Sequence, residues 1–556
     1  MQPAGAFTFV LHSHLPYTRA AGRWPHGEEW LHEAAAETYI PLLDMLNRLQ
    51  TAGIRGGITL GLTPVLLEQL ADADVRANFA GYLEDKIAAA AADVPRFEQS
   101  GETHLAWLAA FYRDRYLAVR RSFTESYSGN LVPAFRALEE AGMIEVITCA
   151  ATHGYLPLLD RDESIELQLR TAVATHRRHM GRAPRAIWLP ECAYRPAYIT
   201  DDGRQRPGLE AHLAANKLRL FFAETHMVEG GQPVGVAAGE AIGPYGSVVR
   251  RYVVPMSKGQ PAQPATTFRP YLVAGADVAV LARDNRAGLQ VWSSEWGYPG
   301  DFDYREFHKK DGISGMQYWR ISGARISLGE KDVYHPDWAA GKVQSQADHF
   351  AALVAGLLDE RRQNSGDFGI VSANYDTELF GHWWFEGIDW LESVVRRLAV
   401  SPQVELTTAS SYLEAHPPDT VINLPEGSWG AGGSHFVWDN ADTHWMWPII
   451  HEAENRMLRV VGRSSPTGAE ASAVLAQAAR ELLLLQSSDW PFLVTTGQAK
   501  EYAVQRFRDH VDRFQSLLDG LEAGHPDASL AATLWEKDKV FPDIDVRWFA
   551  PSASSS

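Results

Sequence analysis

The sequence contains few cysteines. Only Cys149 and Cys192 occur among 556 residues, and two cysteines cannot form the disulfide framework of a small secreted protein. The first five residues also lack the basic and then apolar pattern of a secretory signal peptide. We therefore expect a cytoplasmic protein.

Positive charge is also scarce. The 51 Lys and Arg are outnumbered by 69 Asp and Glu, which gives a net charge of −18 and disfavours DNA or RNA as a partner. No stretch of about 18 uncharged apolar residues is present, so the sequence argues against a membrane protein. The hydrophobic content of 46% and charged content of 22% are typical of soluble globular proteins.

Tryptophan, in contrast, is plentiful. There are 18 Trp residues beside 19 Tyr and 22 Phe. Sugar rings stack on aromatic faces, because both surfaces are apolar in the middle and polar at the rim. Large cores also contain Trp, so this count suggests a carbohydrate site without establishing one.

Short apolar segments alternate with stretches long enough for helices, which is the pattern of a parallel sheet built from βα units. We expect strands at residues 7–11, 57–61, 144–149, 186–189, 218–223, 289–293, 368–373 and 404–408. A parallel barrel needs about this number of strands. The sequence therefore predicts an α/β protein.

Helical patterns fill the remaining stretches. Residues 28–50 predict a helix that Pro41 kinks or divides, with Gly53 as its C-terminal cap. After about residue 410 the strand signals fade, and helical spacing appears at 471–485 and 507–521. Together these patterns predict the following units: a barrel domain at 1–405 with a helical insertion at about 62–140 and a long active-site loop at about 231–270, which includes a hairpin at 247–254; a helical C-terminal domain at 406–550; and a disordered tail at 551–556.

Unusual polar residues tend to follow the expected strands directly. They are His12, His14, His153, Glu191, Glu224, His226, Ser294, Glu295, Asp376 and Glu378. In a parallel barrel the carboxyl ends of all strands meet on one face, where active sites are built. We therefore expect several of these side chains to share one site.

Glu191 and Asp376 are the strongest candidates within this set. Glu191 lies in the sequence Trp-Leu-Pro-Glu-Cys, and Asp376 precedes the aromatic segment Gly-His-Trp-Trp. Two acids among aromatic residues suit a site that binds a sugar and raises the pKa of one carboxyl group by desolvation. Each also has a structural alternative, because Asp376 could cap a helix and Glu191 could interact with a helix dipole.

His12 and His14 present a second alternative. Alternate residues of a strand point the same way, so these two could form half of a metal site. Metal-dependent deacetylases and some mannosidases carry comparable motifs at a first strand. The first strand here supplies no Asp, however, and Cys149 and Cys192 do not complete a ligand set, so we favour hydrogen bonding to a sugar and expect no metal.

Longer motifs resemble glycoside hydrolase family 57, and within it the 1,4-α-glucan branching enzymes. The similarity extends over nearly the whole chain and is carried by His-Ser-His-Leu-Pro at 12–16, Trp-Leu-Pro-Glu-Cys at 188–192, Val-Trp-Ser at 291–293, Gly-Tyr-Pro-Gly at 297–300, Tyr-Asp-Thr-Glu-Leu-Phe-Gly-His-Trp-Trp at 375–384 and Trp-Pro-Phe at 490–492. The resemblance implies an incomplete (β/α)7 TIM-like barrel with helical insertions and an α-helical C-terminal domain. One of the eight expected strands should then lie outside the barrel.

The resemblance also implies roles for individual residues. Glu191 matches the nucleophile and Asp376 the general acid/base of a retaining double displacement, whose carboxyl groups lie about 5 to 5.5 Å apart. The reaction cleaves an α-1,4-glucan and transfers the segment to a 6-hydroxyl, with no cofactor. The residues expected to bind the glucan are His12, His14, His153, Arg283, Trp292, Gly300, Trp429, Trp438, Asp489 and Gln498, together with a loop-tip tyrosine that is either Tyr245 or Tyr252.

Three other kinds of interpretation stay open on the sequence alone. An α-amylase or a 4-α-glucanotransferase would use the same two acids and differ in the linkage it forms. A metal-dependent deacetylase or mannosidase-like enzyme would need a divalent ion. A glucan-binding protein without activity is disfavoured, because both acids are present.

Overall fold

Seven parallel strands form the barrel in the computed structural model, which describes residues 2–23, 25–233, 242–243, 246–247, 259–292, 297–323, 326–462 and 468–549. The strands are β1 (Gly5–Ser13), β2 (Ile58–Leu62), β3 (Ile144–Ile147), β4 (Ala186–Ile187), β7 (Leu220–Ala223), β11 (Ala279–Ala282) and β12 (Gly369–Asp376). They pair in two series, β12-β1-β2-β3 and β4-β7-β11. A parallel bridge between Thr148 and Ile187 joins β3 to β4, and a 3.0 Å hydrogen bond from Asp284 N to Ser372 O joins β11 to β12. The expected incomplete (β/α)7 barrel is confirmed.

Seven of the eight expected strands are present. The strand expected at 289–293 is wrong, because these residues belong largely to helix α10 (Asn285–Trp292). Short apolar segments fit a buried helix as well as a strand, and the true strand of this region, β11, was missed. The last of the eight expected strands, β13 (Val404–Leu406), pairs with β1 at Gly5–Phe7 and lies outside the seven-stranded ring.

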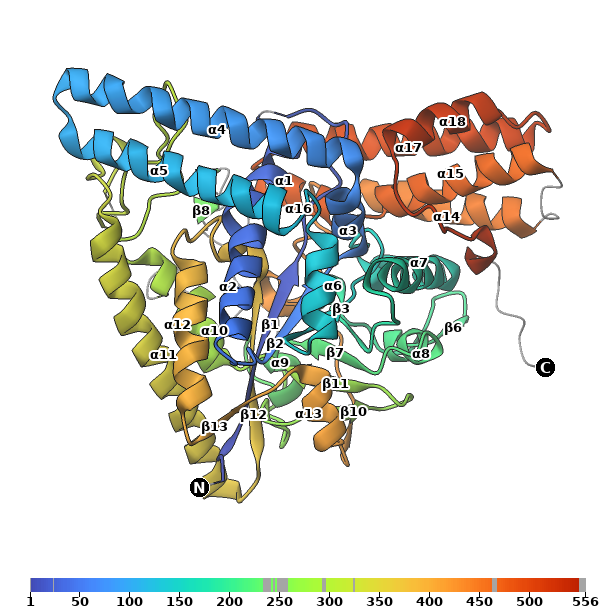
Figure 1. Ribbon diagram of the computed structural model, residues 1–556. Helices are drawn as coiled ribbons and strands as arrows, with labels where there is room; N and C mark the ends of the chain where they lie inside the picture. Colours follow the sequence, from blue (N-terminus) through green and yellow to red (C-terminus); the bar gives the residue numbers. More distant parts are fainter. Residues whose placement is uncertain are drawn as a thin grey trace.

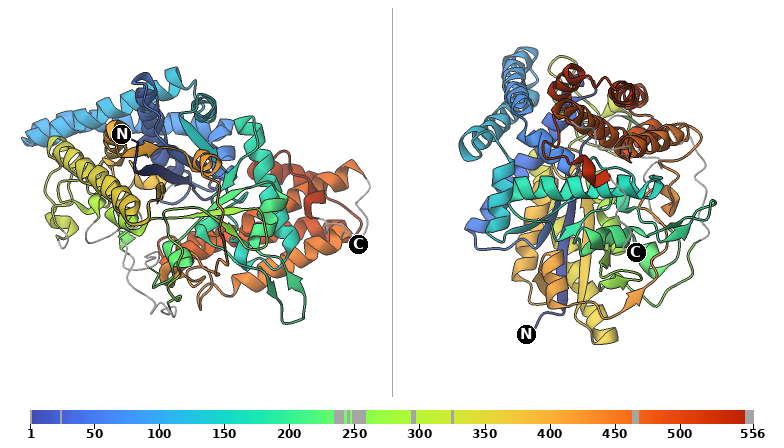
Figure 2. Two further views of the ribbon diagram at one scale, coloured as in Figure 1. Left: turned by 90° about the horizontal axis from the view of Figure 1, so that it is seen from below. Right: turned by 90° about the vertical axis from the view of Figure 1, so that its right-hand side faces the viewer.

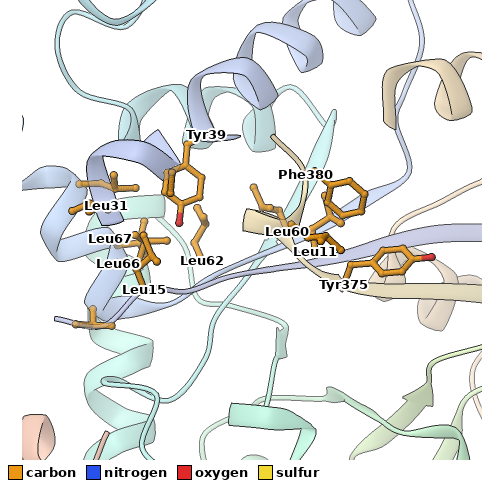
Figure 3. Close-up of a cluster of buried hydrophobic side chains, with 14 of the residues drawn as sticks. Leu11, Leu15, Leu31, Tyr39, Leu60, Leu62, Leu66, Leu67, Tyr375 and Phe380 are labelled. Atoms are coloured by element: carbon orange, nitrogen blue, oxygen red, sulfur yellow. The ribbon is translucent and has the colours of Figure 1, made fainter. Parts of the chain in front are cut away.

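The first helical segment is divided as Pro41 predicts. Helix α1 (Glu28–Ala34) passes through a π-helical turn, η1 (Ala35–Tyr39), into α2 (Ile40–Thr51). Proline cannot donate a backbone hydrogen bond and crowds the preceding turn, so a wider turn before it relieves the clash. Gly53 ends α2 with φ 71°, as expected. Tyr39 from η1 then packs into the buried cluster with Leu11, Leu60 and Phe380 (Figure 3).

Residues 62–140 contain helices α3 (Pro64–Ala71), α4 (Ala73–Ser100), α5 (Thr103–Arg121) and α6 (Val132–Glu140). Helix α4 begins where Asp72 accepts hydrogen bonds from the backbone N–H groups of Asp74 and Val75. Figure 1 shows α4 and α5 lying side by side as a long hairpin that extends away from the barrel. Outer helices that cover the strands are α7 (Asp162–Met180), α8 (Leu209–Ala215), α9 (Thr225–Glu229), α11 (Pro336–Ser365), α12 (Gly387–Val400) and α13 (Ala409–Ala415).

Four short strands lie beside the barrel strands. Strands β5 (Tyr198–Ile199) and β6 (Gln205–Arg206) form a hairpin, and β10 (Tyr271–Val273) links β11 to β14 (Val421–Ile422). Because β14 pairs with this sheet, the chain stays with the barrel beyond residue 405. Two more, β8 (Ile242–Gly243) and β9 (Gly246–Ser247), pair with each other, and nearly all of the hairpin expected at 247–254 lies outside the described residues.

The C-terminal region is helical, as expected. It contains α14 (Met446–Gly462), α15 (Ala469–Leu485), α16 (Asp489–Thr496), α17 (Lys500–Glu522) and α18 (Ala528–Lys537). The two further views in Figure 2 place this bundle against one end of the barrel. Ser488, just before α16, donates its backbone N–H to His153 O at 3.0 Å, so the bundle reaches the barrel's strand ends. None of the helices among the described residues is both long and apolar enough to span a bilayer.

Candidate active site

The candidate site lies at the carboxyl ends of the barrel strands. His12 on β1 pairs in register with Asp376, the last residue of β12, and with Gly61 on β2. Glu191 lies in the turn that follows β4. Parallel pairing thus brings residues from distant parts of the chain to one edge of the barrel, as the sequence predicts.

Glu191 occupies a strained turn. It has φ 62° and ψ 24°, and Cys192 also has a positive φ of 49°. Residues other than glycine rarely adopt this conformation, and such strain is concentrated at functional sites. Trp429 holds the turn, because its backbone N–H donates to Glu191 O at 3.0 Å and its indole Nε1 donates to Glu191 Oε2 at 2.5 Å.

Burial raises the pKa of both acids. The pKa of Glu191 rises to about 8 through desolvation and the charges of Asp376 and Asp489, although the hydrogen bond from Trp429 opposes the rise. Desolvation likewise raises the pKa of Asp376 to about 7, against the opposing effects of His14 and Arg283. Ordinary carboxyl groups are ionised at neutral pH. Both carboxyl groups are therefore partly protonated near neutral pH.

Three histidines form a stacked cluster beside the acids. The rings of His14 and His153 stack with centroids 4.0 Å apart, and the His12 ring stacks on Trp188 at 4.9 Å. His12 Nε2 and His153 Nε2 are 3.0 Å apart, and His153 Nδ1 lies 4.0 Å from Glu191 Oε1. Burial lowers the pKa of His12 and of His153 well below the usual value. Both rings are therefore neutral at pH 7 and can exchange hydrogen bonds with hydroxyl groups.

A carboxylate joins this cluster from the helical region. Asp489, at the start of α16, places Oδ1 2.9 Å from His14 Nε2, which the sequence of the first strand alone did not indicate. The donor atoms of His14, His153 and Asp489 lie within 4.8 Å of one another, as do those of His12, Cys149 and His153. Most of these atoms already bond to each other or to Thr63 and Ser488. The cluster therefore fits a polar wall for a hydroxyl-rich ligand better than a cation site.

Arg283 and two tryptophans complete the site. Arg283 follows β11, and its Nη2 forms an ion pair with Glu224 at 2.9 Å. Trp292, at the end of α10, donates from Nε1 to Asn374 O at 3.3 Å, and its ring meets that of Trp429 with centroids 6.1 Å apart. The aromatic rings of Trp292 and Trp429 thus adjoin the nucleophile candidate, as expected for a sugar site.

Comparison with protein families decides the relationship. The model of glycosyl hydrolase family 57 matches residues 8–425, and the model of the C-terminal region of 1,4-alpha-glucan branching enzymes matches residues 449–549. The chain belongs to glycosyl hydrolase family 57. The resemblance inferred from its motifs is confirmed.

Individual members of family 57 are similar over almost the whole chain. The chain is 44% identical to the 1,4-alpha-glucan branching enzyme TK1436 of Thermococcus kodakarensis, over 98% of this chain and 78% of that protein. The crystal structure of TK1436 has a TM-score of 0.89 and 43% identity, covering 99% of this chain and 97% of that one. The alpha-amylase AmyC of Thermotoga maritima has a TM-score of 0.80 and 30% identity, covering 99% of each chain.

The remaining positions expected from family 57 have different settings. Gly300 is exposed at the end of the short turn Tyr298–Gly300, and Gln498 is half-buried between α16 and α17. Trp438 is 0% exposed and stacks on Tyr155 with centroids 4.4 Å apart. The Trp438 ring is packed against Tyr155, and the role in glucan binding that the family resemblance implies for it stays a prediction. Tyr245 and Tyr252 both lie outside the described residues.

Several residues of the family 57 site were not predicted. Ser488 and Thr63 hydrogen-bond to His153 and His14 at 2.7 and 3.2 Å. Tyr155 shares a 2.8 Å hydrogen bond with His435 Nδ1. Thr63 directly follows a strand, so the rule of polar residues at strand ends could have found it. The others come from loops and the helical region, where the sequence gives no comparable positional signal.

Proposed function

We propose that this chain is a 1,4-α-glucan branching enzyme that acts by a retaining double displacement. The observation that carries the proposal is the presence of two acids at the same end of the barrel, Glu191 in a strained turn after β4 and Asp376 at the end of β12, both with pKa values raised toward neutrality. Relatives that are similar along the whole chain are named for this activity. The glucan would be an uncharged polymer, which agrees with an acidic protein that has little tendency to bind nucleic acid.

In this mechanism Asp376 is protonated and Glu191 is ionised. A nucleophile must be ionised to attack, whereas a general acid must hold a proton to give. The indole N–H of Trp429 donates to Glu191 Oε2 at 2.5 Å and so favours the ionised form of Glu191. The pKa of Glu191 is nevertheless the higher of the two with this hydrogen bond in place, so in this mechanism the bound substrate must shift the proton toward Asp376.

The reaction then proceeds in two displacements. Glu191 attacks the anomeric carbon while Asp376 gives its proton to the departing O4, which leaves a covalent glycosyl–enzyme ester. Asp376, now ionised, takes the proton of a 6-hydroxyl on another glucan chain. The freed O6 attacks the anomeric carbon, forms the α-1,6 bond and releases Glu191.

Transfer succeeds only where a sugar hydroxyl competes with water. Correct positioning of a second reactant lowers the activation barrier by roughly 7 to 11 kcal/mol, which is enough to offset the high concentration of water. Trp292 and Trp429 adjoin the nucleophile, and the wall formed by His14, His153 and Asp489 offers hydrogen bonds. We assign to these groups the binding of the glucan hydroxyls and rings.

A second candidate function is hydrolysis of the same glucan. It is favoured by the likeness to AmyC, an alpha-amylase of comparable length and fold. The same two acids would act, with water replacing the 6-hydroxyl in the second displacement. The two functions therefore differ in their product and not in their catalytic residues.

One assay separates these functions. Purified protein is incubated with amylose, and new α-1,6 linkages are measured by proton NMR beside new reducing ends, with Glu191→Gln and Asp376→Asn as controls. We expect branches in clear excess over reducing ends, and neither product in the controls. Reducing ends without branches would instead establish the hydrolase, and product formation by Glu191→Gln would overturn the assignment of the nucleophile.

We also assign the enzyme to the cytoplasm. Its two cysteines are both free and buried, as is usual in a reducing compartment. Fractionation of the native cells followed by immunoblotting tests this location.

A further inference from the structure

A row of aromatic side chains lies on the outer surface, near the turn between α4 and α5. It joins the start of α5 to the start of α11, two helices on the same side of the molecule in Figure 1. We name it the aromatic strip, and its members are Phe302, Trp338, His335, His104, Trp107 and Phe111. None of these residues takes part in the catalytic site described above.

The ring planes of the strip are nearly parallel. Trp338 stacks on His335 with centroids 4.0 Å apart and an interplanar angle of 14°, and His335 stacks on His104 at 4.2 Å and 19°. The row continues from His104 to Trp107 at 5.7 Å and 10°, and from Trp107 to Phe111 at 5.9 Å and 17°. At nearly 6 Å the centroids of the last rings are too far apart for full face-to-face overlap.

The strip is held in place yet exposed. His104, Trp107 and Phe111 follow each other at helical spacing on one side of α5, and His104 Nε2 donates to Tyr334 O at 2.8 Å. Trp107 is nevertheless 52% exposed and Trp338 48% exposed. Side chains of this size normally bury most of their surface. An ordered, open row of large rings is thus a surface that costs stability and fits a ligand.

The strip continues to the turn that contains Gly300, a position that the family resemblance assigns to glucan binding. Phe302 follows Gly300 by two residues and is 51% exposed. Its carbonyl accepts a 3.1 Å hydrogen bond from Arg320 Nη1, and the Arg320 guanidinium lies 5.7 Å from the centre of the Trp338 ring. A chain of contacts therefore connects the Gly300 turn with Trp338 and the rest of the strip.

The polar rim of the strip suits hydroxyl groups. Arg320 pairs with Asp332 at 2.6 Å and with Asp303 at 3.4 Å, so planar charged groups of both signs flank the rings. Parallel rings with planar donors and acceptors at their edges match a neutral polyhydroxylated chain.

We propose that the aromatic strip is an auxiliary binding site for an α-1,4-glucan chain, outside the catalytic site. It rests on the proposed function, because the ligand is the same polymer on which the enzyme acts. The strip would hold a distant part of a long chain while the part near Gly300 enters the active site. By raising the local concentration of substrate, it would improve the use of polymers far more than that of short oligosaccharides.

The test measures retardation in native gels that contain soluble amylopectin, using full-length protein that carries Glu191→Gln to prevent turnover. The pair Trp107→Ala/Trp338→Ala removes both exposed rings, whereas Trp107→Phe/Trp338→Phe keeps an aromatic ring at each position. Tyr198→Ala, an exposed aromatic residue in the β5–β6 hairpin, serves as the matched control. We expect the Ala pair to bind about tenfold more weakly, the Phe pair to retain most of the affinity, and the control to bind normally.

The same pairs in the active enzyme give a second readout. The Ala pair should lower kcat/KM on amylose by a larger factor than on maltoheptaose, mainly through KM. Equal retardation of the Ala pair and its parent would overturn the proposal. Equal weakening of amylopectin binding by the Ala and Phe pairs would also overturn it, as would a loss of binding that is explained by a lowered Tm of the Ala pair. If the strip binds amylopectin but the enzyme forms no branches, the proposed function falls while the auxiliary site stands.

Discussion

Two buried glutamates of the same barrel have opposite properties. Glu37, in the π-helical turn η1, receives two hydrogen bonds from Arg305, at 3.0 and 2.7 Å. Burial raises its pKa, but the Arg305 guanidinium outweighs burial and holds that pKa below its usual value. Glu191 has no such cation among the described residues, and its pKa rises to about 8. A paired buried carboxylate is a fixed structural charge, whereas an unpaired one can change its protonation at neutral pH.

A raised pKa does not by itself mark a catalytic acid. Desolvation also raises the pKa of Glu454 in α14 to about 8, yet this residue is 0% exposed and accepts hydrogen bonds from Gln486 and from Asp160 N. Glu191 differs in being 14% exposed at its side chain and in its left-handed backbone. Exposure and backbone strain together distinguish the catalytic candidate from a buried core glutamate.

The largest expected effect separates the roles of the two site acids. The fluoride ion of a glycosyl fluoride donor leaves without needing a proton, so Asp376→Asn should still form the covalent intermediate. Azide should then release this intermediate, because it attacks without the help of a general base. Glu191→Gln lacks the nucleophile and should be slower by at least about 10³-fold under the same conditions. Mass spectrometry of the trapped ester measures the difference. Equal rates in the two variants would refute the assignment of roles.

The next effect concerns the paired glutamate. Arg305→Met leaves Glu37 buried without its cation, and we expect a loss of about 3 to 5 kcal/mol in the free energy of unfolding. Urea titration monitored by tryptophan fluorescence measures this change. Glu37→Leu/Arg305→Met removes both charges and should recover much of the loss. A double variant as unstable as the single one would mean that packing against Phe385, whose ring centre lies 3.9 Å from the guanidinium, dominates.

A smaller effect is expected when only one hydrogen bond to Glu191 is removed. Trp429→Phe keeps a ring but loses the indole N–H, so the pKa of Glu191 should rise further and less of the nucleophile should be ionised. A hydrogen bond to a charged group contributes about 1.5 to 3 kcal/mol, which corresponds to a loss in kcat of about tenfold or more. The acid limb of the pH–rate profile should move to higher pH. A lower kcat with an unmoved limb would assign Trp429 to substrate binding alone.

The sequence predicted the catalytic pair because its signals are local. Glu191 and Asp376 each follow a short apolar strand, and parallel barrels place such positions on one face. The partners of the pair were harder to predict. The Trp429 hydrogen bond and the His14–Asp489 contact join residues 238 and 475 positions apart. No periodicity encodes such contacts, and only the family resemblance suggested those residues.

The errors in the fold have a similar physical basis. Residues 289–293 are apolar enough for a strand but continue the amphipathic helix α10, and a short window does not distinguish the two. The missed strand β11 has only four residues, Ala279–Ala282. The strand ends themselves were placed well, because buried parallel strands are uninterrupted apolar runs.

The smallest effect returns to the two glutamates and concerns stability against pH. Because the folded-state pKa of Glu191 is raised from 4.5 to about 8, its stabilising contribution is fully present below about pH 4.5 and is lost as the pH rises through 8. Glu191→Gln cannot ionise, so its Tm should equal that of the parent at low pH and exceed it by a few degrees above pH 8. Glu37 has a lowered pKa, and its stabilising contribution is present above the unfolded value of 4.5. Glu37→Gln should therefore lower the Tm at pH 7 and above. Calorimetric scans measure the change in Tm of both variants relative to the parent. Changes of the same sign in both variants at high pH would contradict the distinction between the two glutamates.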